Sequence, residues 1–134
     1  MDNVEFATAL HTLTLLAGSE DVVSSAFMAS SINVNPVVVR KSLARLRSLG
    51  LVETREGKGG GARLAKPASS ILLSDIYKAV NKAPLLGRTN HPNPDCPVGR
   101  QINERLYTLY EEADKAILEK LESITLADFR SKFK

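Results

Sequence analysis

The chain of 134 residues contains one cysteine, two histidines and no tryptophan, and only 5% of its residues are aromatic. A single cysteine excludes an intrachain disulfide and any metal or iron–sulfur site built from this chain's thiolates alone. Because two histidines add few further ligands, we expect neither a cofactor nor a metal site.

Long hydrophobic runs are also absent. No apolar stretch approaches the roughly 20 residues that a membrane-spanning helix needs. The first five residues, MDNVE, have neither the basic nor the apolar region of a signal peptide. We therefore expect a cytoplasmic protein that binds no membrane.

The positive charge that the chain does carry is concentrated in one segment. Residues 35–64 contain seven basic and two acidic residues, a net charge of +5 in a chain whose total net charge is +3. The remaining residues are therefore slightly acidic. A basic segment in such a chain is typical of a surface that binds a polyanion.

The first third of the chain has the pattern of three helices. Apolar residues recur every three or four positions over residues 4–17, which predicts a helix that ends at the following glycine. A short second helix is predicted from Ser25, or from the serine before it, to about residue 31. The pair Asn35-Pro36 favours the start of a third helix, which should end at Gly50. Two helices joined by a short turn, the second of them basic, have the layout of a helix-turn-helix.

The next residues change to the two-residue period of β-strands. Strands are predicted over residues 51–55 and 62–65, joined by a glycine-rich turn over residues 56–61. A hairpin at this place has the form of a wing beside the helix-turn-helix. A loop is predicted over residues 67–70.

A short helix, a loop and a long helix follow the wing. Ser74 is predicted to cap a helix over residues 75–80, and four prolines between residues 81 and 97 predict no regular structure there. Over residues 98–124, apolar residues recur every three or four positions and predict a helix about 40 Å long. A small winged domain cannot cover so long an apolar stripe, so we expect a second copy of the chain as partner. The expected dimerisation residues are Ile102, Leu106, Leu109, Ala113 and Ile117.

The predicted fold is mainly α-helical with a small β-hairpin. It divides into a winged helix-turn-helix domain over residues 1–80, a proline-rich loop over residues 81–97, and a long dimerisation helix with a C-terminal tail over residues 98–134. The loop holds His91 and Cys96, but no nucleophile motif or oxyanion-binding device accompanies them, so we expect no catalytic residues and no enzymatic activity.

The third helix and the wing supply the groups that recognition of double-stranded DNA requires. Cations bind phosphates, polar side chains reach base edges, and glycines let a wing approach the minor groove. The same charges would suit a solvated helix face, and the glycines lack the spacing of a nucleotide-binding loop. The candidate DNA-binding residues are Ser25, Asn35, Pro36, Val37, Arg40, Lys41, Arg45, Lys58, Gly59, Gly60 and Arg63.

Together these motifs resemble the Rrf2 family of bacterial winged-helix regulators. The resemblance is carried by LARLRSLGLV at residues 43–52, GKGGGARLA at residues 57–65 and ILLSDIYKAV at residues 71–80, and it extends through DCPVG at residues 95–99 to the long helix. It implies a homodimeric transcription factor whose third helix enters the major groove and whose wing reaches the minor groove. It also implies that the loop over residues 81–97 is a sensor region.

The sequence departs from the better-known members of that family, which hold an iron–sulfur cluster with three cysteines in this region. Only Cys96 is present here, so the cluster-binding role is not carried over. Cys96 is a candidate thiol sensor. Sensing of a small molecule, and a structural thiol without sensing, stay open as alternatives.

We therefore expect a sequence-specific DNA-binding transcriptional regulator, a repressor that acts as a homodimer on an inverted-repeat operator. A redox or small-molecule effector, acting through Cys96 or elsewhere, would modulate it. The alternative is a winged-helix module that binds another protein and no specific DNA. Binding of the purified protein to its own promoter region would distinguish the two.

Overall fold

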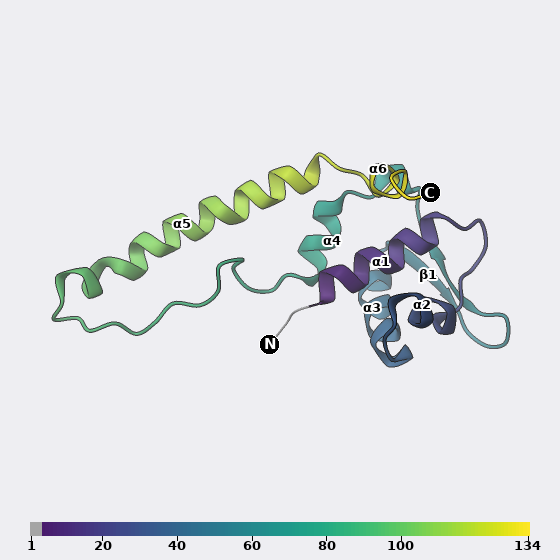
Figure 1. Cartoon of the computed structure of the whole chain (residues 1–134), viewed down its shortest axis with the longest axis horizontal. Coiled ribbons are helices and arrows are strands. Elements are labelled where there is room, and N and C mark those ends of the chain that lie inside the picture. Colours follow the sequence, from purple (N-terminus) through teal and green to yellow (C-terminus); the bar gives the residue numbers. More distant parts are fainter. Residues whose placement is uncertain (1–3) are drawn as a thin grey trace.

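Most of the described chain, residues 4–134 of the computed structural model, is helical, and its sheet is a two-stranded hairpin (Figure 1). The predicted fold class, mainly α with a winged helix-turn-helix and a long helix near the C-terminus, is confirmed. None of the described helices is both long and apolar enough to cross a membrane. The elements are α1 (Glu5–Ala17), α2 (Ser25–Ile32), α3 (Pro36–Ser48), β1 (Val52–Arg55), β2 (Gly61–Leu64), the 3₁₀ helix η1 (Ala68–Ser70), α4 (Leu73–Val80), α5 (Pro97–Glu122) and α6 (Leu126–Arg130).

Helix α1 runs through the folded lobe and packs against α2, α3, α4, α6 and β2. Its apolar face is buried as the periodicity predicts, with Leu13 and Leu16 fully enclosed. Leu46 of α3, Ile76 of α4 and Leu126 of α6 join the same core. Burying a side chain of this size stabilises the fold by about 1.5–3 kcal/mol. The C-terminal tail thus contributes to the core of the winged lobe.

Side-chain caps fix the starts of the two helices of the helix-turn-helix. The Ser24 hydroxyl accepts a hydrogen bond from the Phe27 N–H (3.1 Å), so Ser24 is the cap of α2 and Ser25 its first residue. The Asn35 side-chain carbonyl accepts one from the Val37 N–H (2.9 Å). A proline occupies the first position of α3, as predicted.

The hairpin begins and ends at different residues from those predicted. Helix α3 ends at Ser48, and Gly50, with φ of +75°, turns the chain toward β1. Gly61, predicted as the last turn residue, begins β2 instead. It pairs with Arg55 of β1. A third segment lies beside the hairpin, where Val23 exchanges two backbone hydrogen bonds with Ala62 (2.8 and 2.9 Å). A Cβ at Gly61 would lie 2.2 Å from the Val23 carbonyl oxygen, so the close pairing requires glycine here.

Helix α4 begins at Leu73, which corrects the prediction that Ser74 caps it. The Asp75 carboxylate accepts a hydrogen bond from the Leu72 N–H (3.0 Å) and caps this end of the helix. Ser74 is buried instead, and its hydroxyl has no hydrogen-bond partner in the described part of the chain. The residues before it, predicted as a loop, include the 3₁₀ helix η1.

Helix α5 extends as an arm away from the lobe (Figure 1). It begins at Pro97, one residue before the predicted start, with Cys96 as N-cap, and it ends two residues before the predicted end. Its 26 residues make a helix about 39 Å long, and none of them is buried. Residues 81–96 contain no helix or strand and run outward along the arm to its free end, and the Leu85 N–H donates to the Asp114 carboxylate (3.1 Å).

Candidate nucleic-acid interface

A basic cleft of about 600 Å³ lies between the N-terminus of α2, the exposed side of α3 and the wing. Three arginines line it together with one carboxylate, that of Glu56. The first N–H groups of α2 have no acceptor within the helix, and a helix N-terminus favours phosphate. The cleft therefore suits a polyanion. Its lining residues are Ser24, Ser25, Ala26, Arg40, Leu43, Ala44, Arg47, Thr54, Arg55, Glu56, Gly57, Gly59, Gly60 and Gly61.

Helix α3 has one side in the core and the other open to solvent. Val39 and Leu46 are fully buried. At 100° per residue Lys41 lies nearly opposite them, and Arg40 lies on the side toward the wing, where it lines the cleft. Of these predicted DNA-binding residues, Arg40 is therefore in the cleft and Lys41 on the outermost face of the helix.

The N-terminal end of α3 carries three further predicted DNA-binding residues. Val37 is 46% exposed, and Pro36 is also exposed. The Asn35 side chain is engaged as the helix cap, so its carbonyl oxygen already has a partner. Its structural role leaves the amide group of the same side chain for other contacts.

Two arginines of the cleft, Arg47 and Arg55, were not among the predicted DNA-binding residues. The Arg47 guanidinium donates to the Thr54 hydroxyl (3.1 Å) and so ties α3 to β1. Its seven-residue separation from Arg40 places both on one helix face, a signal that the sequence contains. Arg55 reaches the cleft because the strand register places it opposite Gly61. The sequence alone does not determine this register.

The glycines of the wing tip are required by its backbone. Gly57 and Gly59 have φ of +87° and +78°, a conformation that glycine adopts most easily. A Cβ at Gly60 would lie 2.2 Å from the Arg55 carbonyl oxygen. Lys58 is exposed between these glycines. The tip of the wing thus combines glycine backbone, which has no side chains, with the cation of Lys58.

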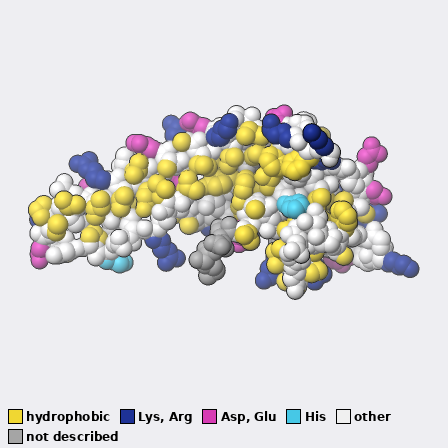
Figure 2. Space-filling model, viewed as in Figure 1, with side chains coloured by type: hydrophobic (Ala, Val, Ile, Leu, Met, Phe, Trp, Pro, Cys, Tyr) yellow, Lys and Arg dark blue, Asp and Glu magenta, His cyan; other side chains and the backbone are white. Residues whose placement is uncertain are grey.

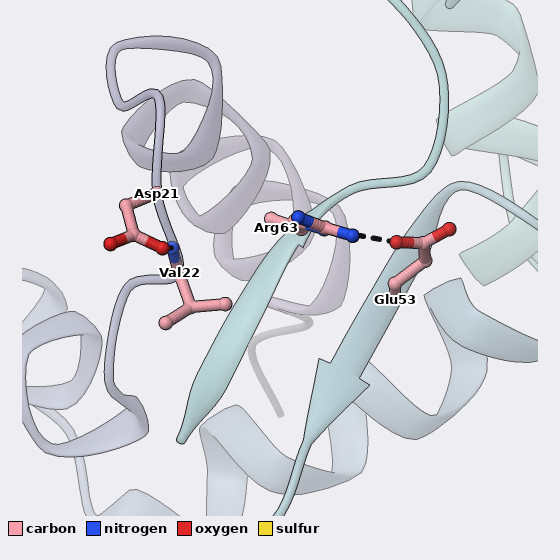
Figure 3. Close-up of polar contacts among 4 residues, drawn as sticks. All are labelled: Asp21, Val22, Glu53 and Arg63. Carbon is pink, nitrogen blue, oxygen red and sulfur yellow. Dashed lines mark hydrogen bonds and ion pairs between the residues drawn. The ribbon is translucent and has the colours of Figure 1, made fainter. Parts of the chain in front are cut away.

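Two predicted DNA-binding cations lie outside the cleft and pair with carboxylates. Arg45 is on the α1 side of α3, with its Nη1 2.9 Å from Glu5 Oε2. Arg63 reaches across the hairpin to Glu53, with Nε and Oε2 3.0 Å apart (Figure 3). Ion pairs this exposed contribute at most about 1 kcal/mol. The paired carboxylates partly neutralise both arginines, and neither arginine lines the cleft.

The predicted dimerisation residues follow one line along α5. Leu109 is 51% exposed, and the other four, Ile102, Leu106, Ala113 and Ile117, are only half-buried. Figure 2 shows hydrophobic side chains along much of this arm. An uncovered apolar face of this length is uncommon on a monomer and marks an interaction surface.

Cys96 lies at the N-terminus of α5 with its thiol exposed. The backbone N–H groups of Gly99 and Val98 lower the pKa of this thiol below its usual value, because they favour the thiolate. Within residues 4–134, no three histidine, cysteine or acidic side chains come together in a way that could hold a metal ion.

Comparison with known proteins shows what the chain is similar to. Residues 3–132 match the profile of the Rrf2 family, described as "Iron-dependent Transcriptional regulator". YwnA of Bacillus subtilis (strain 168), assigned as an HTH-type transcriptional regulator, is 37% identical over 129 residues, which cover 96% of each chain. The crystal structure of a protein assigned to DNA binding shares 35% identity, with a TM-score of 0.74 over 93% of this chain and 97% of that one. CymR of B. subtilis, 21% identical, shares the fold, with a TM-score of 0.74 over 100% of this chain and 98% of its own.

The family description names iron, and the donors of this chain do not fit an iron–sulfur cluster. Such clusters are held by several protein ligands, usually four thiolates. The chain has one cysteine, and even two chains together would supply only two. Cys96 therefore stands alone as an exposed thiol of lowered pKa.

Proposed function

Because the chain belongs to the Rrf2 family of transcriptional regulators, we propose that it acts as a homodimer that binds an inverted-repeat operator and represses transcription there. Members of this family are regulators with a winged-helix DNA-binding fold, and not enzymes. The oligomeric state, the symmetry of the operator, the repression and the residues that contact DNA are our inference.

The arginine-lined cleft is the observation that carries this proposal. Arg40, Arg47 and Arg55 face it with one opposing carboxylate, and arginine binds phosphate oxygens in a bidentate way. We infer that the DNA backbone occupies the cleft. Lys41 and Val37 then face the major groove, where an apolar side chain can contact a thymine methyl group. The wing tip, with Lys58, lies toward the minor groove.

The uncovered stripe of α5 supports the homodimer. Two copies of the stripe related by a twofold axis would cover each other and place two recognition helices symmetrically. Half-sites about 34–36 Å apart, or a multiple of this distance, would match such a pair. The operator is therefore an inverted repeat.

Repression and its control follow from the same arrangement. A dimer seated over successive major grooves covers promoter DNA in the cytoplasm and excludes other proteins from it. Cys96 stands at the free end of the α5 arm, so oxidation of its exposed thiol by a peroxide, or exchange of its thiolate with a small-molecule disulfide that releases one thiol, would alter the distance between the two recognition helices. We place redox control there.

Titration of fluorescent promoter DNA with the purified protein tests the proposal. The double variant Arg40→Ala/Arg47→Ala should bind about 100-fold more weakly, and the slope of log affinity against log salt should fall by about 2, because two phosphate contacts are lost. Lys78→Ala is the matched control, since Lys78 is exposed on α4 and outside the cleft. Unchanged affinity and slope in the double variant would move the DNA site elsewhere. Equal binding of promoter and random DNA by the wild type would favour a protein-interaction module.

A further inference from the structure

A second concavity lies between the C-terminal half of α1, helix α2 and helix α6. Its volume is about 830 Å³, within the range of small-molecule sites. It shares no lining residue with the basic cleft. Neither the DNA-binding face nor the α5 stripe accounts for it.

The walls of this cavity are apolar and include two exposed aromatic rings. Phe27 of α2 is 56% exposed and Phe133, just after α6, is 52% exposed. Phe129 packs against Phe133 with ring centroids 5.4 Å apart, and Leu10 and Leu15 of α1 form part of the opposite wall. Large apolar side chains left in solvent around one hollow indicate a site for an apolar molecule.

The described charged side chains that line the cavity are all positive. Arg130 and Lys134 line it together with His11, and none of its lining residues within 4–134 is an aspartate or glutamate. The Arg130 side chain forms no hydrogen bond or ion pair with any residue of 4–134. A Cβ on Gly18 would lie 2.7 Å from Arg130 Nη2, so the guanidinium rests directly against the backbone at the end of α1. The partial negative charge of that helix end favours the cation there, but it leaves the N–H donors without acceptors.

We propose that this cavity binds a small molecule that has an apolar body and one carboxylate. The carboxylate pairs with the Arg130 guanidinium, which presents donors in the geometry that a carboxylate accepts. The apolar body lies between Phe27 and Phe133. Charge complementarity favours this occupant over a second protein surface, because the charged side chains among the described lining residues, Arg130 and Lys134, are both cationic.

A ligand bound in this cavity would affect the DNA-binding face through α2. Phe27 belongs to this first helix of the helix-turn-helix, and His11 of α1 is joined to Ser31 of α2 by a hydrogen bond of 2.9 Å. A ligand that bridges α6 and α2 would bias the position of α2 and change operator affinity. This consequence rests on the proposed function, whereas ligand binding itself does not.

Calorimetric titration of the full chain with 2-naphthoate, and with the uncharged 2-naphthamide, tests the site. We expect 2-naphthoate to bind at least 10-fold more tightly than the amide. Arg130→Gln should remove this preference, whereas Lys132→Gln should not, because Lys132 is exposed and outside the cavity. Thermal unfolding would confirm that both variants fold.

Gly18→Ala provides a second, independent variant. Gly18 has an ordinary φ of −90°, so alanine fits the backbone, and its Cβ would displace the Arg130 side chain. The same selective loss of 2-naphthoate binding is expected. No binding of 2-naphthoate to the wild type, or equal binding by Arg130→Gln, would overturn the proposal. If the molar mass of the wild type in solution decreases on dilution, and Phe133→Ala has a lower mass than the wild type at the same concentration, the cavity is a contact between two chains instead. Operator titrations with and without 2-naphthoate then test the coupling separately.

Discussion

Helices α1 and α5 have the same spacing of apolar residues, but the apolar face is buried in α1 and exposed in α5. In α1 the apolar stripe is enclosed by the rest of the lobe, and Leu13 is completely buried. In α5 none of the 26 residues is buried, and Val98 and Leu109 remain 68% and 51% exposed. The lobe therefore completes its core within one chain, and the arm does not.

The difference teaches that a hydrophobic period identifies a helix face without identifying what covers it. Burying apolar area stabilises a structure whichever chain supplies the opposing surface. For α5 the length of the stripe, about 39 Å, exceeds what the small lobe can cover. Under the proposed dimer the arm is covered by a second copy, so substitutions there should act differently from substitutions in the lobe.

The largest effect is expected from charges placed in the stripe of the arm. Leu109→Glu with Ala113→Glu would bury two carboxylates at the proposed dimer interface without partners, which is costly. The double variant should sediment as a monomer and lose at least 100-fold in operator affinity. Analytical ultracentrifugation and DNA titration measure the two outcomes.

Thr108→Glu with Lys115→Glu is the matched control for that experiment. Both positions are exposed and lie on the side of α5 away from the stripe. This variant adds the same two carboxylates, also removes the Lys115 cation that lies 4.0 Å from Glu119, and should still remain dimeric. A folded dimer with full affinity in the stripe variant would show that α5 is not the interface.

Leucine-to-alanine substitutions should lower the free energy of unfolding more in the lobe than in the arm. Leu46 is fully buried in the lobe, so Leu46→Ala should lower the free energy of unfolding by about 2–5 kcal/mol. Leu109→Ala removes a half-exposed side chain and should cost less than about 1 kcal/mol in the dissociated chain. Urea denaturation, at a protein concentration where sedimentation shows monomer, measures both. Equal losses would mean that the arm packs within its own chain.

At the free end of the arm, Cys96 is expected to react as a partly ionised thiol. Because the neighbouring N–H groups lower its pKa, more thiolate is present at neutral pH than in free cysteine, and the rate falls as the pH drops through that lowered pKa. The pH profile of iodoacetamide alkylation should therefore have its midpoint below that of N-acetylcysteine. A midpoint at or above the reference would contradict the lowered pKa.

The regulatory role of this thiol has its own test. After mild peroxide or disulfide treatment, the wild type should lose about 10-fold in operator affinity, and Cys96→Ser should lose none. Equal and unchanged binding in both proteins would make Cys96 a structural thiol and point to a different effector.

Much of the lobe could be predicted from the sequence because its signals are local. The Asn35 cap and the helix that follows it depend on neighbouring residues and were found where expected. The start of α4 was misplaced because Asp75, three positions into the helix, supplies the cap instead of Ser74. The glycine-rich composition predicts Gly61 in the turn, whereas the register of the hairpin pairs it with Arg55 and makes it the first residue of β2.

The candidate site was predicted in part, for the same reason. Arg40 and the wing glycines follow from helix and turn patterns and line the cleft. Arg55 enters through strand register, which composition does not reveal. The sequence predicts Arg45 and Arg63 from their charge, whereas the carboxylates that pair with them are brought close only by the packing of α1 and the pairing of the hairpin.

The smallest effect is expected on the outer face of the hairpin, where the lobe's charges already have partners. Arg63→Ala removes a cation paired with Glu53, so operator affinity should fall by less than about 5-fold, the range of an exposed ion pair. Arg55→Ala on the adjoining strand removes a cation that lines the cleft and should cost about 10-fold. Glu53→Ala frees Arg63 and should leave affinity equal or slightly higher. These three titrations on one DNA fragment rank the two sides of the wing, and a larger loss for Arg63 than for Arg55 would place the phosphate backbone on the outer face.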